Sequence, residues 1–350
     1  MSLDRDMSEA LLEQVCQALE SETPLAIQGS GSKAMLGNPV VGEVLDTRCH
    51  RGIVSYDPTE LVITARAGTP LQEIEAVLHQ AGQMLPCEPP HLGPGATVGG
   101  MVAAGLSGPR RPWAGSVRDY VLGTRVITGH GTLLRFGGEV MKNVAGYDVS
   151  RLLAGSFGCL GVLTEVSLKV LPRPRQCLSL CLPMSRQQAL AELLRWGQQP
   201  LPISAACHDG DALWLRLEGG EGSVQSARMR LGGEVADGGF WAELREQRLA
   251  FFAGAEPLWR LSLPIATGDL PLPGRQLLDW GGAQRWLKCA ADAHSIHPIA
   301  EQAGGHATCH GTGVHDSPPL PEALMRYHRA LKHQMDPKRV FNPGRLYPDL

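Results

Sequence analysis

The sequence predicts an α+β fold in two domains, followed by a shorter C-terminal segment. Its 350 residues are enough for about two domains with sizeable cores. In the first half, short strand and helix patterns alternate and are separated by loops rich in glycine. A stretch rich in Pro and Arg at 171–175 then marks a boundary, and six of the seven tryptophans follow within 176–300. We therefore expect domains at 1–175 and 176–305 and a C-terminal segment at 306–350.

The first strands and helix are predicted from local patterns. Residues 25–27 are expected to form a short buried strand, and the β-branched run 60–67 another. A helix should follow, with Thr69 as N-cap and Pro70 as its first residue. Its apolar residues repeat at helical spacing until Gly82 ends it.

The later elements are indicated by turn residues and alternation. Two extended runs within 117–136 flank a glycine pair at 129–131, which predicts a hairpin. Apolar residues alternate with polar ones across 166–170, so we expect one buried face and an outward-facing Ser167. A helix is expected around 322–335.

Composition excludes several classes of protein. The net charge of −3, without a basic run longer than two residues, argues against nucleic-acid binding. No apolar run approaches the roughly 20 residues of a membrane span, and the polar, acidic N-terminus is unlike a signal peptide. Nine scattered cysteines without a CxxC pair indicate reduced thiols and no iron–sulfur cluster in this chain. We expect a cytoplasmic protein.

Glycine is the unusual component of the sequence. The chain has 42 glycines, 12% of its residues, against a usual share of about 7%. Residues 82–161 hold 17 of them in 80 positions. Because glycine lets the backbone approach other groups closely, we expect the function to lie in this region.

A first glycine segment directly follows the strand expected at 25–27. Gly29-Ser30-Gly31-Ser32-Lys33-Ala34 matches the G-x-G-x-x-A dinucleotide pattern. Residues 35–39 cannot continue as the helix that a Rossmann site needs, so we reject that interpretation. The segment remains either a loop whose N–H groups bind an anion or a plain surface turn.

Two further segments are rich in small residues. In 94–109, Thr97 can cap a short helix, and the glycines favour either anion binding or close helix packing. In 142–148 and 155–164, glycines three residues apart precede a strand, a pattern that suits a flat ligand lying along the chain.

In this order, the three segments resemble the FAD-binding domain of the vanillyl-alcohol oxidase/PCMH flavoprotein family. The most specific stretches are PPHLGPGATVGGMVAAGLSGPRR, KNVAGYDVSRLLAGSFGCLGVLTEVSLKV and DPKRVFNPGR. Within that family, the chain is similar to the E-type FAD-binding subunits of bacterial glycolate oxidase. The resemblance implies a PCMH-type FAD-binding domain of two α+β subdomains, an α+β cap domain, and a C-terminal segment that returns to the flavin site.

The resemblance also implies how the cofactor is held. Family members that bind flavin covalently carry a His in the first glycine loop, where this chain has Gln28 followed by small residues, so we expect non-covalent FAD. The implied contacts are Gly29, Ser30, Gly31, Ser32, Ala96, Thr97, Gly99 and Gly100 at the pyrophosphate, Gly158, Gly161 and Val162 at the adenosine and ribityl groups, Lys142, Asn143, Gly146 and Tyr147 along the site, and Asn342 near the flavin ring.

The chain departs from its relatives near the substrate. Related D-2-hydroxy-acid dehydrogenases carry His-x-Gly-Asp-Gly-Asn-x-His and Glu-His-Gly signatures, whereas this chain has Gly305-His306-Ala307-Thr308-Cys309-His310-Gly311. We expect a glycine-rich loop without a metal there, although the types of His306, Cys309 and His310 leave a metal site open. The catalytic residues are unknown. The candidates are Arg110 and Arg111 for binding the substrate carboxylate and His306 as general base.

The resemblance implies an FAD-dependent oxidoreductase that acts on CH–OH groups, with glycolate or a similar D-2-hydroxy acid as substrate. Without a cluster of its own, the chain would pass electrons to a partner. The implied partners are a paralogous FAD-binding catalytic subunit and an iron–sulfur subunit, which could hold the chain at the inner membrane. The alternative is a non-catalytic scaffold subunit that binds FAD or has lost it.

Overall fold

The computed structural model describes residues 4–138, 147–310 and 318–350, and the chain divides into two compact units. The first comprises Met1–Ser107, Gly115–Arg173 and Leu320–Leu350, and the second Gly108–Ala114 and Pro174–Pro319. The units thus divide within the predicted 171–175 boundary. They differ from the expected domains because the short Gly108–Ala114 segment belongs to the second unit, as do the described residues that follow 305 up to Pro319.

The first unit is built on a five-stranded antiparallel sheet in the order β3-β4-β8-β6-β7. The central strand β8 is buried at every residue except its last. The strands are β3 Ile53–Asp57, β4 Val62–Arg66, β6 Val121–Ile127, β7 Leu133–Gly137 and β8 Val162–Lys169.

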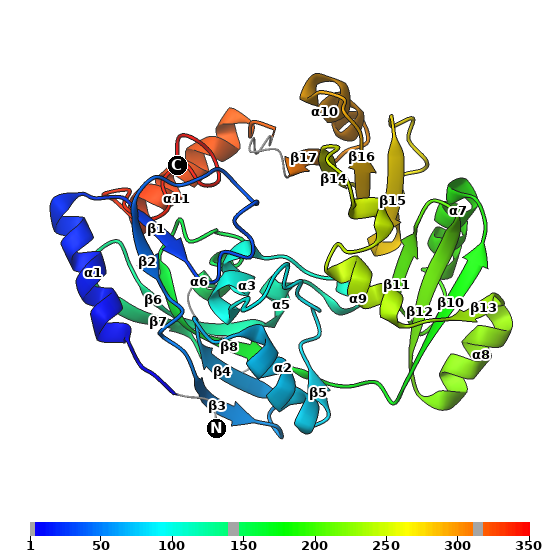
Figure 1. Cartoon of the computed structure of the whole chain (residues 1–350), viewed down its shortest axis with the longest axis horizontal. Coiled ribbons are helices and arrows are strands. Elements are labelled where there is room, and N and C mark those ends of the chain that lie inside the picture. Colours follow the sequence, from blue (N-terminus) through cyan, green and yellow to red (C-terminus); the bar gives the residue numbers. More distant parts are fainter. Residues whose placement is uncertain (1–3, 139–146, 311–317) are drawn as a thin grey trace. The chain divides into compact units, whose positions relative to one another are not determined.

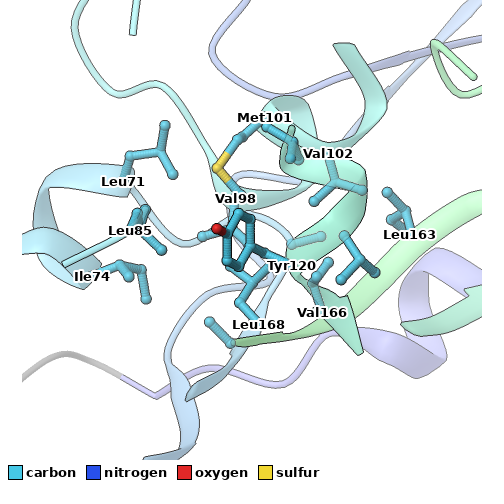
Figure 2. Packing of buried hydrophobic residues seen from close by; sticks show 14 of the residues in the cluster. Leu71, Ile74, Leu85, Val98, Met101, Val102, Tyr120, Leu163, Val166 and Leu168 are labelled. Atoms are coloured by element: carbon cyan, nitrogen blue, oxygen red, sulfur yellow. The ribbon is translucent and has the colours of Figure 1, made fainter. Parts of the chain in front are cut away.

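Helices cover one face of this sheet and enclose the main core. Figure 2 shows Met101, Val98 and Tyr120 packed between Leu71 on one side and Val166 on the other. The core therefore places α3 itself against the sheet. The helices of the first half of the unit are α2 Leu71–Gln80, α3 Val98–Ala104 and α5 Val117–Tyr120.

A second part of the first unit joins the two ends of the chain. The parallel pair β1 and β2 packs against α1 through a cluster that contains Leu25 and Leu45, together with Val340 and Phe341 from the C-terminal tail. Figure 1 shows α1 beside this pair. The elements are α1 Ser8–Ser21, β1 Leu25–Gln28, β2 Glu43–Asp46, β5 Gln83–Met84, α6 Val149–Leu152, β9 Leu171–Pro172 and α11 Glu322–Met335.

Three local predictions for the first unit are wrong. Thr69 does not cap α2, because its hydroxyl bonds both the N–H and the C=O of Gly52. Residues 117–120 form the short helix α5 rather than a strand, since the Asp119 carboxylate accepts a hydrogen bond from the Ser116 N–H. Ser167 is buried and bonds the Thr64 hydroxyl, because both faces of the central strand are covered. The hairpin turn at 129–131 is confirmed.

The second unit contains an eight-stranded antiparallel sheet in the order β13-β10-β12-β11-β15-β16-β14-β17. The residues expected to form a glycine-rich loop around His306 instead form the edge strand β17, which pairs with β14 along its whole length. The strands are β10 Gln176–Pro183, β11 Ile203–His208, β12 Ala212–Gly219, β13 Glu234–Ala236, β14 Leu258–Ser262, β15 Arg275–Asp279, β16 Gln284–Lys288 and β17 His306–His310.

Tryptophans of the second unit serve mainly as core residues. Trp196, Trp241, Trp259, Trp280 and Trp286 are all buried. The helices of this unit are α4 Arg111–Ala114, α7 Arg186–Trp196, α8 Glu221–Leu231, α9 Gly239–Arg245 and α10 Ala293–Gln302, with two 3₁₀ turns, η1 Ala250–Phe252 and η2 Trp280–Gly282.

The α+β class predicted from the sequence is confirmed. All nine cysteines are free thiols. Within the described ranges, no helix has the length and apolar character needed to cross a membrane.

Candidate functional site

A pocket of about 200 Å³ lies in the first unit, where three stretches distant in sequence meet the C-terminal tail. It brings together seven of the residues implied by the family resemblance, namely Gly29, Ser30, Gly31, Ser32, Thr97, Gly100 and Asn342. The other lining residues are Ala26, Ile27, Gln28, Lys33, Ala34, Val40, Ala103, Ala104, Phe157 and Arg345.

The first two glycine loops touch each other along one side of this pocket. A Cβ atom added to Gly29 would lie 2.5 Å from the Thr97 Oγ1 atom, so only glycine fits there without displacement. A Cβ added to Gly93 would lie 3.2 Å from the Ser32 Cβ atom. The glycines therefore allow two backbone segments to form one surface.

The first glycine loop offers unused hydrogen-bond donors. Among the described residues, the backbone N–H groups of Gly29, Ser30 and Gly31 donate no hydrogen bond to the protein. Gly31 has a φ of +75°, a conformation that glycine adopts without strain. Successive free N–H groups in a turn of this kind can bind an anion.

The N-terminus of α3 differs, because the protein itself uses its donors. Thr97 caps the helix, as predicted, by accepting a hydrogen bond from the Gly100 N–H at 3.2 Å. The N–H groups of Val98 and Gly99 donate to backbone carbonyls of the loop after β4 at 2.9 and 2.8 Å. The first turn of α3 therefore shapes the pocket without supplying free backbone donors.

Two of the implied pyrophosphate contacts face the protein interior. A Cβ on Gly99 would lie 2.7 Å from the Ala67 Cβ atom, so this glycine allows α3 to dock against the residue after β4. Ala96 is 2% exposed, and its carbonyl accepts the Leu71 N–H. Gly99 and Ala96 thus have a packing role in this structure.

Two cationic side chains line the pocket beside the first loop. The Arg345 guanidinium donates to the carbonyls of Asn38 and Ala34 at 2.7 and 3.1 Å, which fixes it against that loop. Burial lowers the pKa of Arg345, but an arginine remains charged at neutral pH. The Lys33 ammonium donates to the His91 carbonyl at 3.1 Å. Sequence reasoning missed both residues, although Arg345 ends the quoted DPKRVFNPGR stretch.

Asn342 joins three segments in the lining of the pocket. Its Oδ1 atom accepts the Ile27 N–H at 2.7 Å, and its Nδ2 atom donates to the Phe157 carbonyl at 2.6 Å. A Cβ on Gly158 would lie 2.7 Å from Asn342 Nδ2, so this glycine allows the close approach. Asn342 therefore positions the wall of the pocket rather than presenting a free amide.

A buried ion pair holds the tail that carries Asn342. The Lys332 ammonium is 2% exposed and donates to the Asp336 carboxylate at 2.8 Å and to the carbonyls of Cys159 and Phe341. The fully buried Asp336 carboxylate also accepts the N–H groups of Val340 and Phe341. Lys332 thus links α11, the third glycine segment and the tail.

The remaining implied contacts lie away from the pocket lining. Val162 is fully buried in the core beside α1, and a Cβ on Gly161 would lie 2.7 Å from the Val126 Cγ1 atom. Tyr147 is 97% exposed. The predicted residues Lys142, Asn143 and Gly146 lie outside the described residues.

The three catalytic candidates all belong to the second unit. Arg110 forms an ion pair with the buried Glu218 carboxylate, which suits a structural role. The Arg111 Cζ atom lies 4.4 Å from the centre of the Trp280 ring. Partial burial of the His306 ring and the nearby Arg260 guanidinium lower the pKa of His306, so this ring is neutral at pH 7.

Strand β17 also determines in which directions the possible metal ligands point. Cys309 is buried in the core beneath the sheet, and side chains alternate along a strand, so it points away from the face of His306 and His310. In the part of the chain that the structure describes, no group of three His, Cys, Asp or Glu side chains is arranged to hold a metal ion.

Comparisons with known proteins agree with this geometry. A family described as FAD binding domain matches residues 7–137. The chain is 65% identical over 345 residues to glycolate oxidase subunit GlcE of Escherichia coli (strain K12), covering 99% of each chain. It is 32% identical over 157 residues to glycolate oxidase subunit GlcD of Bacillus subtilis (strain 168), covering 44% of this chain and 33% of that protein.

The chain is more distantly similar to an enzyme and to a solved structure. A D-lactate dehydrogenase of Anaerostipes hadrus is 31% identical over 167 residues, which cover 47% of this chain and 35% of that enzyme. The solved structure of an alkyldihydroxyacetonephosphate synthase superimposes with a TM-score of 0.72 at 18% identity, covering 97% of this chain and 76% of that one. At this identity the structural match shows the fold alone.

Proposed function

The chain belongs to the family of glycolate oxidase E subunits and carries their FAD-binding domain, and from this premise we propose that it is the FAD-binding subunit of a complex that oxidises glycolate or a similar D-2-hydroxy acid. The observation that carries the proposal is the pocket of the first unit. Its lining combines free backbone donors, fixed cations and glycines that allow close backbone approach.

The donor set of this pocket fits the diphosphate of FAD. The unpaired N–H groups of Gly29, Ser30 and Gly31 can donate to phosphate oxygens, and hydrogen bonds to a charged group contribute about 1.5–3 kcal/mol each. Arg345 and Lys33 supply positive charge beside the same loop. We assign the diphosphate to this loop, and the rest of the cofactor to the surface formed by α3, Phe157 and Asn342.

We propose that FAD is held without a covalent bond. Covalent attachment needs a side-chain nucleophile at the cofactor, and the proteins that carry such a bond use a residue such as histidine or cysteine. Among the described residues that line the pocket there is neither a histidine nor a cysteine. Where relatives with covalent flavin carry a histidine, this chain has the amide Gln28 followed by small residues.

When bound, FAD supplies the chemistry of accepting a hydride from the α-carbon of the substrate. The side chains of this protein would hold the cofactor, exclude water and bind the substrate carboxylate. The sequence has no CxxC pair for a cluster, so a partner must carry the electrons onward. We propose a paralogous FAD-binding subunit and an iron–sulfur subunit as partners. The names of the relatives, two different subunits of glycolate oxidase, support a complex of this kind.

A cytoplasmic location is part of the proposal, with the partner subunits holding the complex at the inner membrane. The nine free thiols support a reducing compartment.

The second candidate function is a non-catalytic scaffold subunit that binds FAD or has lost it, while a paralogous subunit performs the oxidation. The observation that favours it is the altered histidine region. Strand β17 separates Cys309 from His306 and His310, and this chain lacks the acidic residues of the related signatures. The chain would then lack the histidine signatures that its relatives carry near the substrate.

One experiment separates the two functions. Glycolate is added anaerobically to the purified chain, alone and after reconstitution with its partner subunits, and the visible flavin bands are recorded. Bleaching of the flavin in the isolated chain supports a catalytic subunit. Bleaching that requires the partner subunits supports the scaffold. A chain that neither contains nor takes up FAD contradicts the first function and leaves only a scaffold that has lost the cofactor.

A further inference from the structure

Both faces of the second unit's sheet carry buried apolar residues, and Arg260 lies on the face of Trp286. In the strand pairing, Arg260 on β14 lies opposite Trp286 on β16 and Thr308 on β17. Directly opposed residues of antiparallel strands share a face, and neighbours along a strand point the other way. Trp259 and Leu261 accordingly join the core beneath α10, and Arg260 lies on the opposite face with Trp286, which belongs to another apolar cluster.

Two guanidinium groups lie against one tryptophan on that face. The Arg260 Cζ atom is 5.2 Å from the centre of the Trp280 ring, and the Arg111 Cζ atom is 4.4 Å from it. The ring is fixed because Trp280 is 4% exposed and its Nε1 atom donates to the Gly108 carbonyl at 3.0 Å. The same bond holds the short segment that carries Arg111.

The hydrogen-bond partner of Arg260 is neutral. Its Nε atom donates to the Gln284 Oε1 atom at 2.6 Å, and within the described residues its terminal nitrogens donate no hydrogen bond. The acidic neighbour is Asp279, whose two oxygens accept the Trp280 N–H and the Gln284 amide. Thr308 and the neutral His306 face Arg260 from β17.

The guanidinium groups of Arg260 and Arg111 both lie beside the Trp280 ring, and Asp279 is the acidic group that acts on Arg260. Burial and the Arg111 charge lower the pKa of Arg260 to about 10, which agrees with a cation whose charge is only partly compensated. The neighbouring Arg110 shows the contrast, because the fold gives it the buried carboxylate of Glu218. Among the described residues no carboxylate bonds the terminal nitrogens of Arg260, so they are open to an anionic ligand.

We propose that Arg260, supported by the positive charge of Arg111 and by the Trp280 ring, binds the carboxylate of a small organic acid. The identity of that acid, a 2-hydroxy acid such as glycolate, rests on the proposed function. A guanidinium presents two parallel N–H groups that match the two oxygens of a carboxylate. Gln284 orients this fork by holding the Nε atom, so Gln284 is a positioning residue.

The test is a calorimetric titration of the full chain with glycolate. The chain is first freed of flavin so that no oxidation of glycolate competes with binding. The unsubstituted chain should bind glycolate, and Arg260→Gln should weaken the affinity by about tenfold or more, the effect of losing one charge-assisted contact. Arg260→Lys keeps the charge but loses the pair of parallel N–H groups, so its glycolate affinity should lie between those of the unsubstituted chain and Arg260→Gln. Arg111→Gln, a change of an exposed side chain, should weaken binding severalfold.

The matched control is Arg275→Gln. Arg275 lies on the same sheet by pairing with Lys288, but it is exposed and forms a surface ion pair with Glu256. Its substitution should leave glycolate affinity unchanged. The proposal is overturned if the unsubstituted chain does not bind glycolate, or if both Arg260→Gln and Arg111→Gln bind it as tightly as the unsubstituted chain does.

A separate titration of each variant with FAD distinguishes this proposal from the proposed function. Arg260 and Arg111 belong to the second unit, and the FAD pocket to the first. All variants should therefore retain FAD affinity. If the unsubstituted chain does not bind FAD, the proposed function is contradicted. The glycolate titration then decides by itself whether Arg260 binds a carboxylate. If Arg260→Gln fails to fold by circular dichroism, Arg260→Lys and Arg111→Gln decide the result.

Discussion

The Asn342 side chain accepts a hydrogen bond from the Ile27 backbone N–H at 2.7 Å, although 315 residues separate the two along the chain. The same amide donates to the Phe157 carbonyl. One side chain near the C-terminus thus fixes the end of the first strand to the third glycine segment. Both contacts lie in the wall of the pocket that we assign to FAD.

Asn342→Ala should weaken FAD binding by about tenfold, because it leaves the Ile27 N–H and the Phe157 carbonyl without partners and frees the wall of the pocket. A fluorescence titration of flavin with the purified variant measures this. Asn38→Ala is the control, since Asn38 Nδ2 also bonds the C-terminal tail, at the Gly344 carbonyl, but is not among the pocket-lining residues. Equal FAD affinity in the two variants would contradict the positioning role of Asn342.

Gly29→Ala should lower FAD affinity by roughly tenfold or more, because the new methyl group would lie 2.5 Å from Thr97 Oγ1 and would push the two loops apart. The control is Gly222→Ala on α8, where an added Cβ meets no atom within 4 Å. That variant should bind FAD normally and be unchanged or slightly stabilised in urea unfolding. Normal FAD binding by Gly29→Ala would show that the loops do not form one surface.

Substitution of Gly99 should reduce stability rather than block the cofactor directly. A larger side chain there, as in Gly99→Val, meets Ala67 beneath α3 and should destabilise the first unit before it affects the pocket directly. Urea unfolding followed together with flavin fluorescence checks this. The midpoint of unfolding should fall, and FAD affinity should change only to the extent that folded protein is lost.

Lys332→Met should destabilise the protein by about 3–5 kcal/mol, because the fully buried Asp336 carboxylate loses its counter-charge. The double variant Lys332→Met/Asp336→Asn removes both charges and should be destabilised by less than the sum of the two single changes. Chemical unfolding of all four proteins gives the coupling free energy. A coupling near zero would mean that the pair does not hold the C-terminal tail.

His50 should make stability depend on pH. It is fully buried, with Nδ1 accepting the Met7 N–H and Nε2 bonding the Thr164 carbonyl, so the neutral ring fits the folded protein. Burial is the main cause that lowers the pKa of His50, and the Arg66 charge adds to it, against the opposing effects of Asp6 and Glu165.

Because the folded pKa of His50 lies below the unfolded value of about 6.5, its contribution to stability is complete above that value and is lost as the pH falls through the folded pKa. Urea midpoints should therefore be lower at pH 5.5 than at pH 7.5, and His50→Gln should reduce this difference. His79→Gln, a change of an exposed histidine on α2, should leave the difference unchanged. An identical pH difference in His50→Gln would contradict the assignment.

The sequence was sufficient to identify the glycine segments, since small residues at close spacing mark where backbone must approach another group. The structure brings Gly29, Thr97 and Asn342 to one pocket. The sequence alone does not predict which glycines face a ligand and which face the core. Gly99 and Gly161 have the same local signal as Gly31 but are required by packing, because they contact Ala67, which follows β4, and Val126 in β6.

Other features depend on contacts that no local pattern encodes. Thr69 has the pattern of a helix cap, yet its hydroxyl bonds Gly52 across the fold. His306 lies in a strand because β14 offers it a partner 44 residues away, as Ser262 lies opposite His306. Arg260 stands in an ordinary amphipathic strand, and only the tertiary structure shows Arg111 beside it.

The absorbance spectrum of the purified chain, recorded before and after acid precipitation, tests the central claim most directly. We predict flavin bands in the native protein, about one FAD per chain, and release of all the flavin into the supernatant when the protein is precipitated. Flavin that remains with the precipitated protein would contradict non-covalent binding. A chain without flavin bands that gains none when FAD is added would contradict the assignment of the pocket itself.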